Sequence, residues 1–228
     1  MRIASVCLLV LSFAGTLFPQ GPVGAVGTAT QGEGFDIVIV NGHIMDGTGS
    51  PWYSGQVGIR AGRIAAIGNL SAAPRRQTID AMGKVVAPGF IDMLGQSELT
   101  MLVDPRVPSK IFQGITTEIT GEGSSAAPIN QAMVAADRAG YDHLKITPDW
   151  TTLREFFAHL EHQGMGINLA SYVGATSVRR MVLGDADVQP TAAQLAEMQT
   201  LVRQAMQDGA VGLSTALQYA PSPLCSNG

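Results

Sequence analysis

The sequence has little charge and few cysteines, and both shortages restrict what the chain can do. Only 14% of its 228 residues are charged, and the net charge at pH 7 is −4. No basic run or patch stands out, so nucleic acid is not expected as a partner. The two cysteines, Cys7 and Cys225, have no partners at metal-site spacing. Neither a cysteine metal site nor an internal disulfide is therefore expected in the mature chain.

Long apolar runs are lacking after the first residues. Arg2 precedes an apolar run over 3–11, and small residues with Pro and Gly follow over 22–30. This layout predicts a signal peptide over residues 1–29, with cleavage near Ala25 or Ala29, and a secreted or periplasmic protein. The alternative is an N-terminal membrane anchor, but the run is shorter than the roughly 20 residues that span a bilayer.

Histidine is also scarce, which limits the metal sites that the chain can build. His43 lies in a region of predicted strands, and His143, His159 and His162 lie on or beside a predicted helix over 149–164. His159 and His162 have the i, i+3 spacing of a zinc pair, yet a solvated helix face is the favoured interpretation.

Hydrophobic residues are plentiful, at 46%, so the chain can bury a core. Residues 35–88 contain short alternating segments broken by turn signals at Asn41-Gly42, Ala61-Gly62 and Met82-Gly83. Five or six strands in about fifty residues predict a small β-sandwich or β-roll domain over 35–88.

After Pro88 the pattern changes to alternating strands and helices. We expect strands over 114–120, 167–174 and 210–215. Helices are expected over 149–164, with a Thr152–Glu155 capping box, and over 191–208, with a Thr191–Gln194 capping box. This order predicts parallel βα units.

A closed eight-stranded α/β barrel takes about 250 residues, so residues 89–228 supply either a smaller open sheet or the first half of a barrel. The ending SPLCSNG does not continue as a βα unit should, which favours a truncated longer protein.

Several stretches resemble the amidohydrolase superfamily, and within it the N-acyl-D-amino-acid deacylases, or D-aminoacylases. They are DIVIVNGHIMDGTG (36–49), QVGIRAGRIAAIG (56–68), IDAMGKVVAPGFID (79–92), GITTEITGEGSSAAP (114–128), LASYVGATSVR (169–179) and DGAVGLSTALQYAP (208–221). The likeness covers residues 35 to 221, and the motifs are strong jointly rather than singly.

The resemblance implies an α/β fold with a β-sandwich beside a (β/α)8 barrel, of which this chain would hold the front part. It implies hydrolysis of an N-acyl-D-amino acid, a small-molecule substrate, to a carboxylate and a D-amino acid. It also implies one zinc ion, held by a ligand in a loop that follows the second barrel strand and by two later histidines, with a later aspartate as the base. Those histidines and that aspartate would fall beyond residue 228, so the catalytic residues are expected there and the fragment alone should be inactive; the substrate-binding residues stay unknown.

The chain departs from the family pattern at two strand ends. Histidines spaced i, i+2 after the first barrel strand could share a metal, but these positions hold Leu94 and Gln96. Leucine cannot ligate, and an amide is a poor zinc ligand. In the loop GEGSSAAP the family cysteine is absent, and Glu122 is the only ligand-type side chain. We therefore predict Glu122 as the metal ligand, with a solvated loop carboxylate as the alternative.

The roles of two further side chains stay open, and so do two alternative functions of the protein. Glu98 follows the missing histidine pair and is either a site residue or an ordinary surface or capping carboxylate. Arg179 either faces a substrate carboxylate or lies on a helix surface. The chain could instead belong to a cyclic-amide hydrolase of the same superfamily, like a dihydroorotase or hydantoinase, or to a barrel-like binding protein that has lost its metal.

Overall fold

The computed structural model describes residues 34–216. The expected signal peptide and the chain end after residue 216 lie outside these residues. The chain divides into two compact units, with the boundary between Pro88 and Gly89. Each unit is described by itself below.

The first unit is a single five-stranded sheet. Its strands are β1 (Phe35–Ile44), β2 (Tyr53–Arg60), β3 (Arg63–Gly68), β4 (Arg75–Asp80) and β5 (Val85–Val86). The order is β3-β2-β1-β4, and β5 also pairs with β1. The pairs β1–β2 and β2–β3 are antiparallel, whereas β4 and β5 run parallel to β1. One small cluster of Phe35, Val38, Ala66 and Leu70 forms the core. A second sheet, which a sandwich needs, is not formed by the described residues.

The prediction of a turn at Asn41-Gly42 is wrong, because β1 continues through these two residues to Ile44. Asn41 takes a φ of 56°, and the pairing register with β2 shifts between Ile39 and Gly42. Such a left-handed residue inside a strand makes a bulge rather than a reversal. Partner strands on both sides extend β1 past the bulge. The turn expected at Ala61-Gly62 is confirmed, with φ values of 50° and 72° between β2 and β3.

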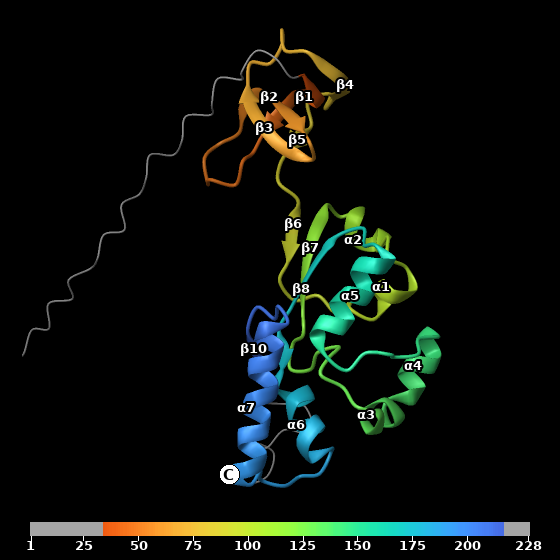
Figure 1. Ribbon diagram of the computed structural model, residues 1–228. Helices are drawn as coiled ribbons and strands as arrows, with labels where there is room; N and C mark the ends of the chain where they lie inside the picture. Colours follow the sequence, from red (N-terminus) through yellow and green to blue (C-terminus); the bar gives the residue numbers. More distant parts are fainter. Residues whose placement is uncertain (1–33, 217–228) are drawn as a thin grey trace, which may run out of the picture. The chain divides into compact units, whose positions relative to one another are not determined.

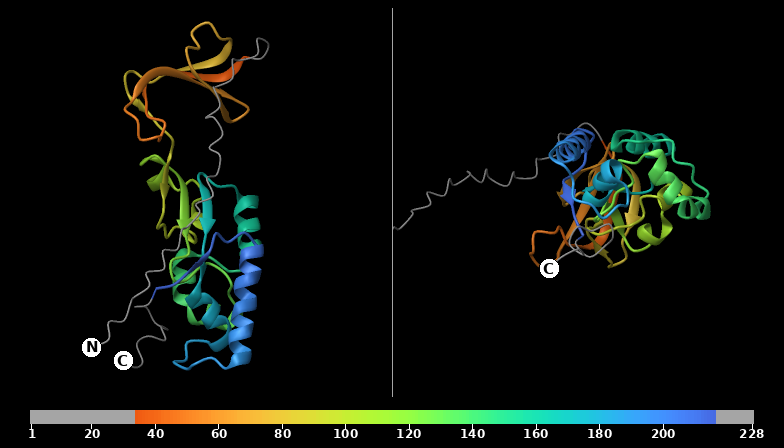
Figure 2. Two further views of the ribbon diagram at one scale, coloured as in Figure 1. Left: turned by 90° about the vertical axis from the view of Figure 1, so that its left-hand side faces the viewer. Right: turned by 90° about the horizontal axis from the view of Figure 1, so that it is seen from below.

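The second unit alternates strands and helices, as the sequence predicts. Strands β6 (Phe90–Asp92), β7 (Ile115–Thr120) and β8 (Asn168–Ser171) form a parallel sheet, and β9 (Val173–Gly174) and β10 (Leu213–Ser214) form a parallel pair. The helices are α1 (Thr100–Val103), α2 (Pro108–Ile111), α3 (Gln131–Ala136), α4 (Arg138–Leu144), α5 (Leu153–Gln163), α6 (Ala175–Leu183) and α7 (Ala192–Gln207). Figure 1 shows β6, β7 and β8 side by side with α2 and α5 beside them, and Figure 2 gives two further views. The described strands form no closed barrel.

Both long helices begin as their capping boxes predict. The Thr152 hydroxyl accepts from the Glu155 N–H, and the Glu155 carboxylate accepts from the Thr152 N–H at 2.9 Å. Thr191 and Gln194 repeat this arrangement at the start of α7. Each box satisfies two backbone donors that the first turn leaves free. Gly164, at a φ of 83°, ends α5 where the sequence places it.

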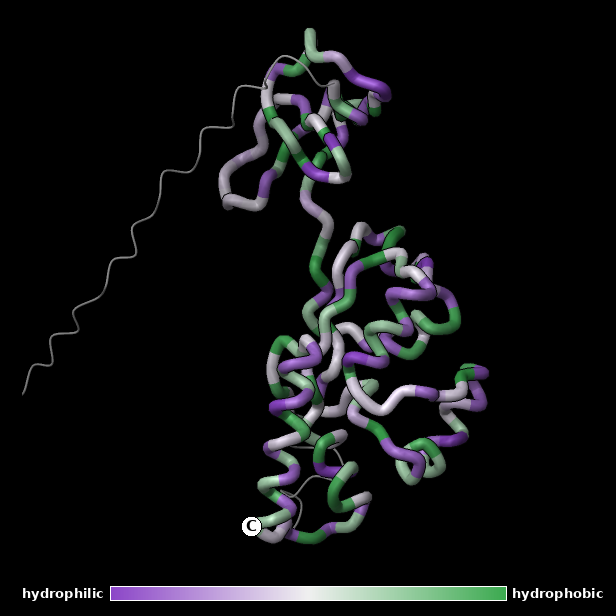
Figure 3. The backbone as a smooth tube through the Cα atoms, viewed as in Figure 1, coloured by the Kyte–Doolittle hydropathy of each residue, from purple (hydrophilic) through white to green (hydrophobic). Residues whose placement is uncertain are grey.

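The core of the second unit lies between its helices and strands. Phe156, Leu153 and Leu160 line one face of α5 and are almost fully buried. Strand β6 is different: its hydrophobic stretch, green in Figure 3, is solvent-exposed, with Phe90 at 65% and Ile91 at 57%. Within residues 34–216, no helix has the length and apolar character needed to cross a membrane.

Phe156→Ala tests this core, because it removes a ring that is 0% exposed. We expect it to lower the free energy of unfolding by about 3–5 kcal/mol. Phe112→Ala is the matched control, since that ring is 89% exposed, and should change stability by less than about 0.5 kcal/mol. Urea titrations followed by Trp150 fluorescence in a Trp52→Phe background report on this unit, because the chain has 2 tryptophans. Equal effects of the two substitutions on stability would contradict the placement of Phe156 in the core of the second unit.

Candidate functional site

The carboxyl ends of several strands meet at one edge of the second unit. Thr120 at the end of β7 pairs with Ser171 at the end of β8, and Gly174 of β9 pairs with Ser214 of β10. Because parallel strands present their carboxyl ends at the same edge, the segments that follow them lie together. The candidate site is built from the loop after β7, residues 121–125, and the loop after β6, residues 93–99.

The loop after β7 turns sharply around Glu122. Gly121 and Gly123 flank it with φ values of 89° and 67°, a region that favours glycine. A Cβ on Gly121 would lie 2.4 Å from the Tyr172 carbonyl oxygen, and one on Gly123 would lie 2.9 Å from the Ala216 Cβ. The two glycines are therefore required both by backbone conformation and by close packing.

Hydroxyl groups hold the far end of this loop. The Ser125 N–H donates to the Ser177 hydroxyl at 2.9 Å, and that hydroxyl donates back to the Ser125 carbonyl at 3.1 Å. The Ser125 hydroxyl accepts from the Gly174 N–H and donates to the Ala127 carbonyl. The Thr176 N–H, in the first turn of α6, donates to the Gly123 carbonyl at 2.9 Å. The loop is thus tied to the start of α6.

Glu122 itself is exposed at this strand end. Within residues 34–216 its carboxylate has no hydrogen bond or ion pair to another residue. A carboxylate with free oxygens on a fixed turn suits a zinc ion, for which Asp and Glu oxygens are ordinary ligands. The structure therefore leaves Glu122 available as the predicted ligand.

A complete metal site is not present in the described part of the chain. Residues 34–216 contain no group of three or more His, Cys, Asp and Glu side chains placed to hold an ion. Leu94 is 60% exposed and Gln96 is exposed in the loop after β6. The Leu94 N–H donates to Asp92 Oδ1 at 3.2 Å, which turns the chain away from the strand. The donor set here fits one ligand of a zinc site and requires the others from elsewhere.

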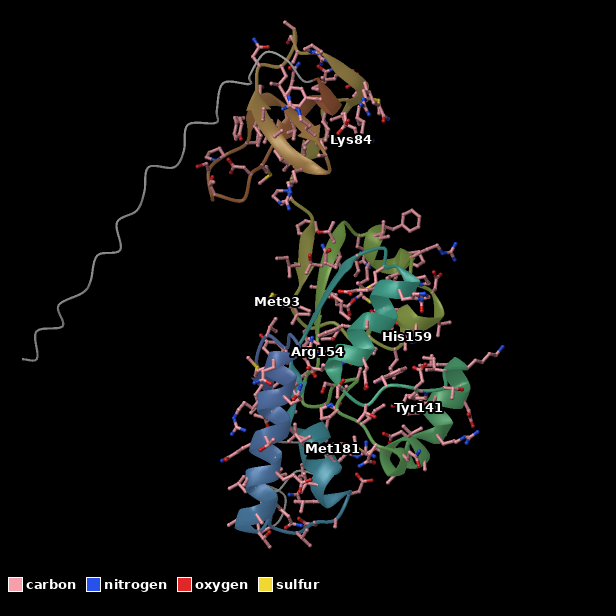
Figure 4. The ribbon with its side chains drawn as sticks, in the orientation of Figure 1. Lys84, Met93, Tyr141, Arg154, His159 and Met181 are labelled. Carbon is pink, nitrogen blue, oxygen red and sulfur yellow. The ribbon has the colours of Figure 1, made fainter. Side chains whose placement is uncertain are left out.

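Histidines do not gather at the strand ends. His43 stacks on Trp52 in the first unit, with ring centroids 3.9 Å apart. His159 lies 3.5 Å from Asp149 on the helix layer. Figure 4 shows His159 on α5, well apart from Met93, which follows β6. Glu122 is therefore the candidate ligand that the structure places at the strand edge.

A partly buried ion cluster lies behind the loop after β6, and the sequence reasoning missed it. Glu118, in the middle of β7, is 0% exposed. The Lys110 ammonium of α2 lies 2.5 Å from Asp92 Oδ2 and 3.6 Å from Glu118 Oε1. Hydrogen bonding to Lys110 lowers the pKa of Asp92, and the same bond raises the pKa of Lys110. The one feature of the sequence that could have indicated this cluster is the carboxylate of Glu118 inside the β-branched run ITTEIT.

Glu118 also fixes the loop after β6. Its Oε1 accepts from the Ser97 N–H at 2.9 Å, and the Gly95 N–H donates to the Ile119 carbonyl at 2.8 Å. A Cβ on Gly95 would lie 1.9 Å from Glu118 Oε1, so only glycine fits there. The loop keeps a defined shape through these contacts and without the histidine pair.

Glu98 is a half-buried carboxylic acid rather than a surface or capping group. Its Oε2 is buried and has no hydrogen-bond partner among the described residues. Burial raises the pKa of Glu98, and the nearby Glu118 carboxylate adds to the increase. Burial disfavours the charged form because the protein interior solvates it poorly.

Arg179 has a structural role that neither interpretation of the sequence anticipated. It lies on α6 but is only 6% exposed, so it is not a helix-surface residue. Its Nη2 donates to the carbonyl oxygens of Ala186 and Val188 at 2.9 and 2.7 Å. The guanidinium therefore holds, through Nη2, the segment that follows α6.

Comparisons with known proteins identify relatives of this chain. No family model matches it. It is 40% identical to N-acyl-D-glutamate deacylase of Alcaligenes xylosoxydans xylosoxydans over 83% of this chain and 38% of that protein. It is 33% identical to D-aminoacylase of the same organism over 85% of this chain and 40% of that protein.

Solved structures give the same result. The chain superposes with a TM-score of 0.74 and 39% identity on N-acyl-D-glutamate deacylase from Bordetella bronchiseptica, crystallised with zinc and a phosphonate inhibitor, over 84% of this chain and 40% of that one. A D-aminoacylase structure described with a binuclear metal centre gives a TM-score of 0.73 and 34% identity, over 82% of this chain and 40% of that one.

These likenesses cover both units and include the strand-end loops described above. The chain is therefore related to the amidohydrolase family, through its N-acyl-D-amino-acid deacylases and D-aminoacylases. The match fits the N-terminal portion of these relatives, and the chain spans about two fifths of their length, at 38% and 40%.

Lys110→Met tests the partly buried ion cluster of Lys110, Asp92 and Glu118. It leaves Asp92 and Glu118 facing each other without a cation, so we expect a loss of about 3–5 kcal/mol in the free energy of unfolding. Adding Glu118→Gln should recover part of this loss. Lys84→Met, at an exposed lysine of the first unit, is the control and should change stability by less than about 0.5 kcal/mol. If Lys110→Met is as harmless as the control in urea titrations, the cluster is not an ion pair network.

Glu98→Gln tests whether burial raises the pKa of the Glu98 carboxyl group. Because the folded protein raises the pKa of Glu98 above its ordinary 4.5, it binds the proton more tightly than the unfolded chain does. The stabilising contribution is therefore complete below pH 4.5 and declines as the pH rises towards the folded pKa. We expect the Tm of Glu98→Gln, relative to wild type, to increase from pH 4 to pH 8.

Glu155→Gln provides the opposite control. Backbone hydrogen bonds from Thr151 and Thr152 lower the pKa of Glu155, so its contribution is present above pH 4.5 and is lost as the pH falls. The Tm of that variant relative to wild type should decrease as the pH rises. A Glu98→Gln difference that stays constant across the range would show that burial does not shift this acid.

Proposed function

We propose that this chain is the N-terminal portion of a metal-dependent hydrolase that cleaves the amide bond of N-acyl-D-amino acids to a carboxylate and a free D-amino acid. The observation that carries the proposal is the likeness to named deacylases, at 33–40% identity over more than four fifths of this chain. The chain contributes a strand-end carboxylate, Glu122, at the loop where the resemblance implies a metal ligand.

The finer fold assignment forms part of the proposal. We infer that the unit beginning at Gly89 supplies the first strands of a (β/α)8 barrel and that residues 35–88 supply part of a β-sandwich. The exposed apolar side chains of β6 support this inference, because an edge strand with Phe90 and Ile91 in solvent lacks a partner. The signal peptide over residues 1–29 and a secreted or periplasmic location remain part of the same proposal.

Glu122 would hold a zinc ion, and we propose one ion per full-length protein. When bound with an open coordination position, zinc lowers the pKa of a water ligand to about 7 and polarises a carbonyl. The chain's own residues fix the turn that presents the carboxylate. Leu94 and Gln96 leave the first strand end without ligands, which favours one ion rather than two. The remaining ligands and the general base belong beyond residue 228.

Hydrolysis of N-acetyl-D-glutamate by the full-length protein tests the proposal, with the L enantiomer as the substrate control. We expect hydrolysis of the D form, about one zinc per chain, and no activity in the 228-residue chain alone. Glu122→Gln should reduce both zinc content and rate, the rate by more than about 100-fold, because a direct ligand matters more than a residue behind one. Glu161→Gln, an exposed carboxylate on α5, should change neither.

The outcomes of these measurements distinguish the proposed function from the alternative functions. Equal zinc and equal rate in Glu122→Gln would remove Glu122 from the site while leaving the hydrolase proposal standing. Hydrolysis of cyclic amides in place of N-acyl-D-amino acids would favour the dihydroorotase-like alternative. A full-length protein with neither zinc nor hydrolysis would favour the binding protein, which the substitutions at Leu94 and Gln96 support.

A further inference from the structure

One side chain from a distant strand binds on both sides of Glu122. The hydroxyl of Ser214, at the end of β10, accepts from the Gly123 N–H at 3.1 Å and donates to the Gly121 carbonyl. These residues are separated by 91 and 93 positions in the sequence. Among the described side chains, only that of Ser214 bonds to both residues that flank Glu122.

The two bonds demand a hydroxyl group. The Gly121 carbonyl needs a donor and the Gly123 N–H needs an acceptor, and a serine hydroxyl supplies both from a single atom. Gly121 and Gly123 are buried, so water does not readily replace a lost partner. The peptides before and after Glu122 are therefore tied to one oxygen atom, and the turn that carries the carboxylate has little freedom to change.

The position of Ser214 follows from strand pairing. Ser214 pairs with Gly174 in the parallel ladder of β9 and β10. A Cβ on Gly174 would lie 2.4 Å from the Ser124 Cα, so the loop packs directly on the end of β9. The register that places Gly174 under the loop also places the Ser214 hydroxyl within reach of its two glycines.

We propose that Ser214 is a positioning residue for Glu122: its hydroxyl fixes the turn so that the carboxylate is held in the orientation that metal binding requires. This inference rests on the proposed role of Glu122 as a ligand. It assigns Ser214 an effect on metal affinity through Glu122, and not merely on the stability of the fold. Groups that orient a ligand in this way typically change metal affinity by about 10–100-fold when they are removed.

The test is the zinc affinity of the full-length protein, measured by competition with a chelator at a temperature well below unfolding. We expect Ser214→Ala to weaken zinc binding by about 10–100-fold. Ser124→Ala is the matched control, because this exposed serine lies in the same loop and its hydroxyl makes no hydrogen bond within residues 34–216. It should leave the affinity unchanged.

A second pair of variants keeps the inference testable if Ser214→Ala fails to fold. Ser214→Thr retains a hydroxyl, whereas Ser214→Val introduces a side chain with the shape of threonine but without a hydroxyl. Zinc affinity close to wild type in the threonine variant, with a loss in the valine variant, supports the inference. Equal affinities in these two variants overturn it.

A double-mutant cycle separates this inference from the proposed function. In a Glu122→Gln background, Ser214→Ala should cause no further loss of zinc affinity, because the two residues act as a unit. Reduced binding in Glu122→Gln with normal binding in Ser214→Ala overturns the positioning role alone. Wild-type affinity in Glu122→Gln overturns both the ligand assignment and the inference that rests on it.

Discussion

The site depends on the close packing of the turn at residues 121–123 against the ends of three other strands. The Tyr172 carbonyl leaves no room for a side chain on Gly121, and the neighbouring Gly123 meets Ala216 in the same way. Parallel pairing of β7 with β8 and of β9 with β10 brings these segments to one edge. A turn fixed by such contacts presents one carboxylate to solvent in a defined place, which a free loop would not do.

The sequence predicted the long helices of the fold and missed the short helices. Helices α5 and α7 were found because each has a capping box and enough turns to show a periodic apolar face. Helices α1 and α2 contain 4 residues each, too few for a period to be recognised. The continuation of β1 past Asn41-Gly42 depends on its partner strands, since the dipeptide alone favours a reversal.

The candidate site was predictable only where its chemistry was local. Glu122 was predicted as a candidate ligand because it follows a β-branched strand and stands in a recognisable loop that lacks the family cysteine. The roles of Glu118 and Arg179 could not be read from the sequence, because each depends on a tertiary partner. Glu118 is buried against Lys110 of α2, and Arg179 binds carbonyls of the segment that follows its own helix. A charged residue becomes compatible with burial only when such a partner is supplied by the fold.

The partly buried ion cluster of Lys110, Asp92 and Glu118 explains how the first strand end keeps its shape without metal ligands. A metal bound to two histidines would hold the loop after β6 in place. Here the Ser97 N–H bonds to Glu118, and the Lys110 ammonium lies within ion-pair distance of both Glu118 and Asp92. The groups that organise this loop are therefore part of the polypeptide: Glu118 bonds the loop and Lys110 pairs with Glu118.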